Sequence, residues 1–470
     1  LSGARVELAR DRLTISDTTG ALGELPLSLA AEITPAGGEI QAGLSGALPS
    51  MKRHLPTLFE YMAVDGATSL SETIRWRLRE GAAPPADLED VWRAIRPENP
   101  SADPDAWLAS IRERYDLTAD GSAQLQSAEI TPSVFPTRLT NISGTVRHDL
   151  ERAWTPEPVA VDAGEGTTGA RAVVEILFPL GGVTPELRFD IVSAEHINVT
   201  AWTHEWNRLH PDEPHHAWPE DLQYDANLAR RFIIRGQGRS RTAEYRQFQG
   251  EDFRFRLGYD LHEGQPSMLT WSDVEAVLAG GVFRHHGSLF NHNLGLWLAI
   301  ERGELQEIVR MATQKDKQYG LASGIITGEV ELGRRVGDVP TPWRGQGQLR
   351  IEESRFVSNK IFNSLGGLLK LPFFEDISFS TIEGPFTVHG ERFSSDGITF
   401  NGPIVNLKAS GDVGPDEQLD LKVQIEFLQI AGRIPLVAQA LEIFNRLAGQ
   451  VLMVRIRGTF DNPDIQPLGL

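Results

Sequence analysis

The residues best suited to metal or acid–base chemistry lie in a stretch rich in histidine and proline, 204–216. His204 and His210 approach the His-Glu-x-x-His motif of helical zinc sites, but Arg208 stands where the second His is required. The prolines within the stretch favour an irregular polar connection over a helix. We therefore predict a polar loop and no metal site. The other histidines that would add to incidental metal binding are His215, His216, His285, His286 and His292.

The motifs of other enzyme classes are incomplete. Residues 236–238 and 345–347 each carry two glycines, which we interpret as turns or bulges, because the third glycine and the following helix of a dinucleotide site are missing. The stretch 320–324 has the wrong spacing for a nucleophile elbow. The absence of Cys excludes thiolate catalysis, and 64 acidic residues make carboxylate pairs too common to identify a glycosidase. We predict no enzyme activity and no cofactor, and keep a hydrolase as a third alternative.

The overall composition favours a folded protein whose partners are apolar molecules or other proteins. Hydrophobic residues make up 40% of the 470 and charged residues 23%. The net charge of −19 argues against nucleic acid, which requires a basic surface, and against binding to anionic lipid through charge. No run approaches the roughly 18 apolar residues of a membrane-spanning helix. The chain opens on a strand-like pattern without Met, so we expect any membrane anchor to lie upstream of Leu1.

Alternation of apolar and polar residues is the main structural signal. It is clearest at 419–427, where every odd position is apolar and every even position is polar. Because successive side chains of a strand point to opposite faces, such a strand has one apolar and one polar face. Short turns separate the runs, as at 384–385 and 402–403, which favours antiparallel neighbours. The sequence therefore predicts a mainly β fold built on an elongated antiparallel sheet.

We divide the chain into four segments. They are N-terminal strands over 1–50, a helical insertion over 51–120, a central β region with polar insertions over 121–348, and a C-terminal region over 349–470. Within the insertion, 71–79 is interpreted as helical or irregular, and 271–278 in the central region is interpreted as helix-like.

Two apolar helices are predicted near the C-terminus, at 356–371 and 434–451. Either they cover the end of the sheet and keep its edge from pairing with other chains, or they contact a membrane or a partner. We favour the covering role, and for Phe373 and Phe374 between the helices we favour buried packing over an exposed aromatic tip. The residues of the second helix expected to form the cap are Leu436, Val437, Leu441, Phe444 and Leu447.

The C-terminal region resembles a known family. The run 454–463, Val-Arg-Ile-Arg-Gly-Thr-Phe-Asp-Asn-Pro, is similar to the ending of AsmA-like C-terminal regions, and 382–414 is similar to their repeated hairpin. The resemblance covers 320–470 and extends to 1–50, whereas 51–320 shares only the strand texture. It implies a periplasmic protein of the Gram-negative envelope, anchored to the inner membrane, with a sheet curled into an apolar groove that moves phospholipid between membranes. The family has no catalytic motif to carry over.

An apolar groove is physically suited to acyl chains, because each methylene removed from water contributes about 0.8 kcal/mol. The partners implied are phospholipid acyl chains, a membrane and envelope proteins. The alternative is a structural or scaffolding envelope protein whose apolar face is closed by a second layer. The residues predicted to line the groove are Phe253, Phe255, Leu257, Leu294, Leu296, Leu298, Val330, Phe386, Val388, Ile398, Phe400, Val405, Leu407, Leu419, Leu421, Val423, Ile425 and Phe427.

Overall fold

The structure is a computed structural model of the chain. It describes residues 5–54, 62–95, 111–132, 138–164, 166–177, 186–202, 232–261, 265–313, 322–337, 339–428 and 451–468. Strands account for most of these residues, so the predicted mainly β fold is confirmed. The chain divides into two compact units. The N-terminal unit comprises Leu1–Arg241 and Leu257–Ser267, and the C-terminal unit comprises Thr242–Arg256 and Met268–Leu470, which differs from the four segments expected from the sequence.

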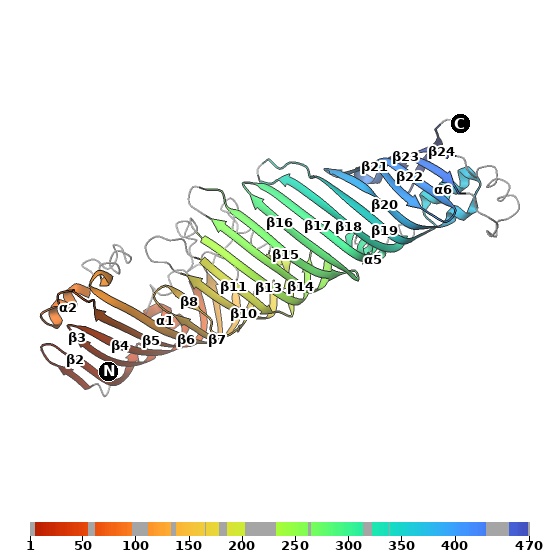
Figure 1. Cartoon of the computed structure of the whole chain (residues 1–470). Helices are drawn as coiled ribbons and strands as arrows, with labels where there is room; N and C mark the ends of the chain where they lie inside the picture. Colours follow the sequence, from red (N-terminus) through yellow and green to blue (C-terminus); the bar gives the residue numbers. More distant parts are fainter. Residues whose placement is uncertain are drawn as a thin grey trace. The chain divides into compact units, whose positions relative to one another are not determined.

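The N-terminal unit begins with strands that follow one another in chain order. From β1 to β7 each strand pairs antiparallel with the next (Figure 1). Their bounds are β1 (Arg5–Leu8), β2 (Leu13–Leu22), β3 (Leu25–Thr34), β4 (Gly37–Ala47), β5 (Met62–Leu78), β6 (Tyr115–Pro132) and β7 (Leu139–His148). The expectation that 71–79 is helical or irregular is wrong, because β5 runs through it. Glu72 occupies a position in the apolar series between Leu70 and Ile74 and so hides the alternation of this strand.

The rest of the N-terminal unit departs from a simple meander. Both β8 (Arg152–Trp154) and β9 (Val159–Ala163) pair with β7 and with β10 (Thr167–Leu177). β10 also pairs with β11 (Glu186–Ser193) and β12 (His196–Asn198). β11 then pairs with β13 (Phe232–Tyr245) in parallel, an exception to the antiparallel arrangement that we predicted. The connection is long enough for a parallel crossover, and the His-rich stretch 204–216 within it lies outside the described residues.

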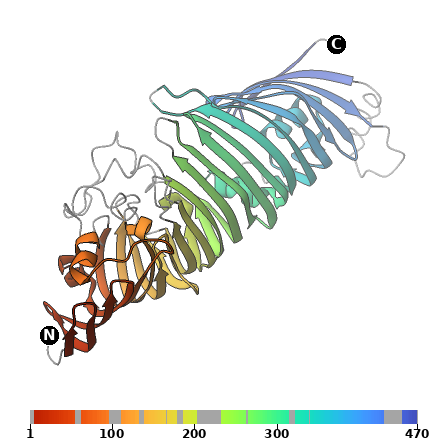
Figure 2. The same cartoon turned by 60° about the vertical axis from the view of Figure 1, so that its left-hand side comes forward.

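The C-terminal unit is a regular antiparallel meander. From β15 to β25 each strand pairs with the next, and the strands lie side by side in chain order (Figure 2). The bounds are β14 (Phe248–Leu261), which the division between the units crosses, β15 (Met268–Leu278), β16 (Gly281–Phe290), β17 (Asn293–Glu304), β18 (Ala322–Arg335), β19 (Arg344–Val357), β20 (Asp376–His389), β21 (Arg392–Asn401), β22 (Val405–Val413), β23 (Gln418–Phe427), β24 (Val451–Thr459) and β25 (Pro463–Pro467).

The expectation of a helix at 271–278 is also wrong, because these residues belong to β15. A β-bulge lies between Trp271 and Val274, where Asp273 has a φ of 52°. The bulge inserts a residue, so the apolar side chains follow one another at a spacing of three and then two. That spacing imitates the start of a helical pattern, whereas the flanking cross-strand pairs are those of an ordinary strand.

Helices are short and lie between strands. Their bounds are α1 (Leu48–His54), α2 (Leu88–Ile95), α5 (Leu305–Thr313), α6 (Lys360–Leu369), η3 (Pro372–Glu375) and η4 (Pro415–Glu417). The helix expected at 356–371 is therefore shorter than predicted, since β19 continues to Val357. Asn359 caps α6 by accepting hydrogen bonds from the next backbone amides, and Lys370 ends the helix in the left-handed conformation. The predicted capping residues 436–447 lie outside the described residues.

Candidate functional site

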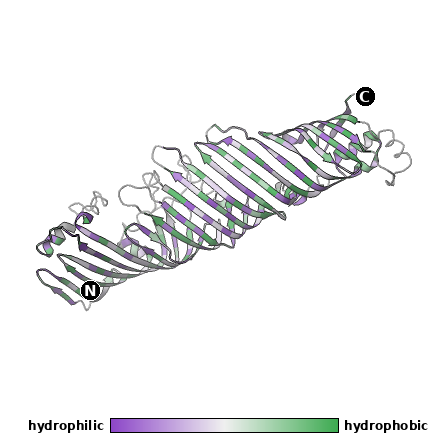
Figure 3. Ribbon diagram, in the orientation of Figure 1, coloured by the Kyte–Doolittle hydropathy of each residue, from purple (hydrophilic) through white to green (hydrophobic). Residues whose placement is uncertain are grey.

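Cross-strand register places apolar residues of β15–β20 in rows on one face of the C-terminal unit. The central row joins Val274, His285, Leu298, Val330, Gly347 and Phe386. The row on one side joins Trp271, Gly287, Leu296, Leu332, Gly345 and Val388, and the row on the other joins Ala276, Phe283, Ile300, Gly328, Leu349 and Gly384. We call these three the apolar rows. Along the same strands Figure 3 shows hydrophobic residues alternating with hydrophilic ones, as two-faced strands require.

Most side chains of the apolar rows keep some contact with solvent. Only Ala276 and Val388 are buried, and the others, including Leu296, Leu298 and Val330, are partly buried. Apolar side chains that recur in register over several strands and remain partly exposed are typical of an interaction surface. The strands of this part of the sheet therefore offer a continuous apolar surface.

The opposite face of the same strands is charged. Arg284 on β16 contacts Glu275 on β15 at 3.2 Å and Glu301 on β17 at 3.0 Å. Arg254 on β14 contacts Glu275 at 2.8 Å and, by this hydrogen bond, lowers the pKa of that carboxyl group. Exposed pairs of this kind contribute at most about 1 kcal/mol each. Their main effect is to make this face polar, so that an apolar ligand has only one face to bind.

Further along the C-terminal unit the same face is covered. Phe362 and Leu365 of α6 and Phe374 of η3 pack on strands β19–β24, and all three are buried. The ring of Phe379 on β20 lies 5.7 Å from that of Phe362 and 5.3 Å from that of Phe400. α6 therefore covers the sheet, as we expected for a cap. The expectation of buried packing is confirmed for Phe374, whereas Phe373 is only partly buried. This part of the apolar face is a closed core.

The predicted lining residues accordingly divide into two groups by burial. Those that remain partly exposed are Leu257, Leu294, Leu296, Leu298, Val330, Phe386, Ile398, Phe400 and Leu421. Those that are buried are Phe253, Phe255, Val388, Val405, Leu407, Leu419, Val423, Ile425 and Phe427. From Val405 onward the buried residues belong to the core beneath α6 and η3. Alternation alone could not separate the partly exposed residues of the face from the covered ones.

The paired glycines interpreted as turns or bulges lie inside strands instead. Gly347 on β19 is opposite Phe386, and Gly236 on β13 is opposite Phe189. A Cβ atom at either glycine would collide with the facing aromatic ring. Gly287 stands in the same relation to Trp271. Glycine is required here for close approach of a ring from the next strand, a role that its turn propensity conceals.

The described histidines do not form a metal site. His285 lies in the central apolar row, where its Nε2 accepts a hydrogen bond from Trp271 Nε1 at 2.6 Å and its Nδ1 donates to the Trp297 carbonyl at 2.8 Å. Burial lowers the pKa of His285, which favours the neutral ring that this pattern requires. His286 points to the opposite face and stacks on Trp297. No group of three or more metal-ligating side chains occurs in the described part of the chain.

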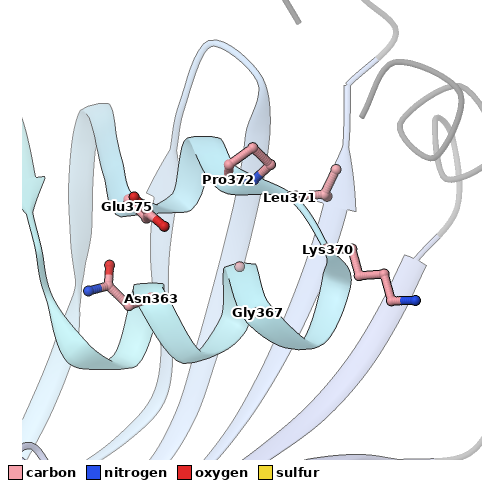
Figure 4. A pocket seen from close by; sticks show the side chains of 7 residues that line it. Asn363, Gly367, Lys370, Leu371, Pro372 and Glu375 are labelled. Carbon is pink, nitrogen blue, oxygen red and sulfur yellow. The ribbon is translucent and has the colours of Figure 1, made fainter. Parts of the chain in front are cut away.

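A small pocket lies where α6 turns into η3 (Figure 4). Asn363 and Glu375 lie on one side of it, and the Lys370 side chain extends away from them. The Oδ1 atom of Asn363 is buried and has no hydrogen-bond partner within the described residues. The pocket volume of about 250 Å³ is below that of typical small-molecule sites, about 300–1,000 Å³. We therefore take the apolar rows, and not this pocket, as the candidate site.

No family model, no curated protein and no solved structure matches this chain. Within the residues that the structure describes, no helix is long and apolar enough to cross a membrane.

Proposed function

We propose that this chain binds lipid acyl chains on the apolar rows of the C-terminal unit. The observation that supports the proposal is the partial exposure of Leu296, Leu298 and Val330, which face the same side of neighbouring strands. An acyl chain laid across them would remove apolar surface from water on both partners, at about 0.8 kcal/mol for each buried methylene. The head group would remain in solvent, so no specific site for it is required.

The biological setting that we propose rests on the resemblance of 320–470 to AsmA-like regions. In that setting the chain is a periplasmic protein, held at the inner membrane by an anchor upstream of Leu1, and not an enzyme. It takes part in phospholipid transport between membranes, or in maintaining the outer membrane, with other envelope proteins as partners.

The binding of acyl chains is tested by changing the two faces of one strand. The double variant Leu296→Gln with Leu298→Gln places two amides in adjacent apolar rows, and the control Ala299→Gln with Glu301→Gln changes the opposite face of β17. We expect phospholipid that co-purifies with the protein, measured by mass spectrometry, to fall about tenfold in the first, because each lost methylene contact weakens binding by about 0.8 kcal/mol. The control should retain the parent amount. Unchanged loading in a folded double variant would contradict the proposal.

A second candidate function is a structural or scaffolding role in the envelope. The closed core beneath α6 and η3 favours it, because that part of the face has no room for a ligand chain. The same measurement distinguishes the two functions: a scaffold would carry no phospholipid in the parent protein.

A further inference from the structure

An ion pair stands on the apolar face of the N-terminal unit. Glu72 on β5, Gly121 on β6 and His148 on β7 are directly opposite one another in register. The His148 Nε2 atom donates to Glu72 Oε2 at 2.9 Å, across the strand that lies between them. A Cβ atom at position 121 would collide with both side chains, so the absence of a side chain at Gly121 is what lets the pair meet.

The pair is surrounded by apolar side chains on the same face. Leu70 and Val146 on one side of it belong to a cluster built on Leu25, Leu44 and Met51. On the other side Ile74 belongs to a cluster built on Trp76 and Tyr115. The pair's remaining neighbours on this face are small: Ala42 on β4, Ala119 and Ala123 on β6, and Ala153 on β8. The ion pair of Glu72 and His148 therefore separates two apolar patches, one around Leu70 and one around Ile74.

The pair retains unused hydrogen-bonding capacity. The side chains of His148 and Glu72 are 40% and 28% exposed, so solvent or a ligand can reach them. His148 donates to Glu72 and also forms a hydrogen bond with the backbone of Asp149, while Asp120 acts on it only through its charge. Glu72 Oε1 has no partner among the residues described here and can accept one donor. With His148 protonated the pair has no net charge, which suits a neutral or zwitterionic group better than an anion.

We propose that Glu72 and His148 form a head-group site for a lipid that carries an N–H donor, such as a phosphoethanolamine. The amine donates to the free Glu72 oxygen, and the acyl chains lie on the patches around Leu70 and Ile74. This assignment goes beyond the apolar rows of the C-terminal unit, because it adds a second lipid-binding surface, with a head-group site, in the N-terminal unit. It rests on the proposed function, since acyl chains supply most of the binding energy at both surfaces. The head-group site supplies the preference among lipids.

The test is a competition between lipids with identical acyl chains. The purified full chain is incubated with mixed detergent micelles that contain equal amounts of phosphatidylethanolamine, phosphatidylcholine and phosphatidic acid, and bound lipid is quantified by mass spectrometry. We expect the parent to prefer the ethanolamine lipid over the choline lipid by about threefold to tenfold, the effect of one partly solvated charged hydrogen bond. Choline has no N–H group, and phosphatidic acid adds negative charge beside Glu72.

Two variants should shift the preference in opposite directions. Glu72→Gln removes the charged acceptor and should bring the ethanolamine-to-choline ratio close to one, without lowering total lipid. His148→Gln leaves the carboxylate unneutralised and should raise the ratio. Glu39→Gln is the matched control, since Glu39 pairs with Arg75 on the opposite face of the same sheet. It should behave as the parent does.

The outcomes distinguish the head-group site from the proposed binding of acyl chains. An unchanged ratio in folded Glu72→Gln, or a parent without preference, overturns the head-group site while leaving acyl-chain binding intact. A parent that binds none of the three lipids overturns the proposed function itself. A purely structural role of the pair would lower thermal stability in both variants without moving the ratio.

Discussion

Glycine and aromatic residues act together in this sheet at the level of single side chains. At four positions an aromatic ring from one strand lies over a glycine of the neighbouring strand, and the ring fills the space left by the missing side chain. The pairs are Trp76 with Gly38, Phe189 with Gly236, Trp271 with Gly287, and Phe386 with Gly347. A ring packed against the backbone of a glycine leaves a flatter apolar surface than a ring that projects away from the sheet. Such a surface suits a flexible hydrocarbon chain, which has no fixed shape to match.

At the same scale, the pair of His148 and Glu72 makes stability depend on pH. The hydrogen bond to Glu72 raises the pKa of His148 above its ordinary value. A raised folded-state pKa means that the native state binds the proton more tightly, so the contribution to stability is complete below a pH of about 6.5, the ordinary value, and is lost as pH rises through the raised pKa.

We therefore expect the urea midpoint of the parent to fall relative to that of Glu72→Gln as the pH is raised from about 6 to 9, through the range in which histidines titrate. The measurement is urea unfolding of both proteins at each pH, followed by circular dichroism. The difference between the two midpoints should shrink with rising pH. A constant difference would mean that the pair does not titrate in this range.

At the scale of elements, α6 and η3 turn one part of a sheet face into a closed core, whereas most side chains of the apolar rows stay partly exposed. Truncating a side chain should therefore lower the free energy of unfolding more in the core than on the apolar rows. Phe374→Ala removes a fully buried ring of η3 from the core that η3 and α6 form with the sheet, and should lower the free energy of unfolding by about 3–5 kcal/mol. Leu298→Ala removes a side chain that is partly exposed on the apolar rows and should cost less than about 2 kcal/mol. Equilibrium urea unfolding of each variant measures both values.

Equal losses in the free energy of unfolding at the two positions would show that Leu298 is as fully covered as Phe374. Leu365→Ala serves as the internal standard, since Leu365 on α6 is also buried in the core and should resemble Phe374→Ala in sign and order of magnitude.

The success of the sequence-based predictions also differed from element to element. β23 was predicted correctly because its apolar and polar residues alternate without a break. β15 was not, because the bulge at Asp273 shifts the phase of its alternation, and β5 was not, because Glu72 stands in its apolar series. The parallel pairing of β11 with β13 joins residues far apart in the chain, and no local pattern specifies that register.

The candidate site was predictable only in part, for a related reason. Alternation assigns Leu298 and Val423 to the same kind of face, yet Val423 is buried under a helix and Leu298 is not. Which part a helix covers depends on tertiary packing. The meeting of Glu72 with His148 over Gly121 depends on the register of three strands, and neither residue stands out in the sequence.

At the scale of the whole molecule, the chain combines a net charge of −19 with an apolar face. If the chain binds lipid as we propose, its negative charge opposes the approach to a membrane that carries anionic lipid. The proposed binding then rests on apolar contact, which does not weaken as salt screens charges.

We expect phospholipid loading from anionic vesicles to rise, or at least not to fall, when the ionic strength is increased from about 0.05 M to 0.5 M, since the screening length shortens from more than 10 Å to a few ångströms. Loading is measured by mass spectrometry after the vesicles are removed by sedimentation, with neutral phosphatidylcholine vesicles as the control that salt should leave nearly unchanged. A steep fall with salt would instead mean that basic side chains hold the head groups. Arg284 on the charged face is poorly placed for that role, because it already pairs with Glu275 and Glu301 and would have to give up a carboxylate partner to bind a phosphate.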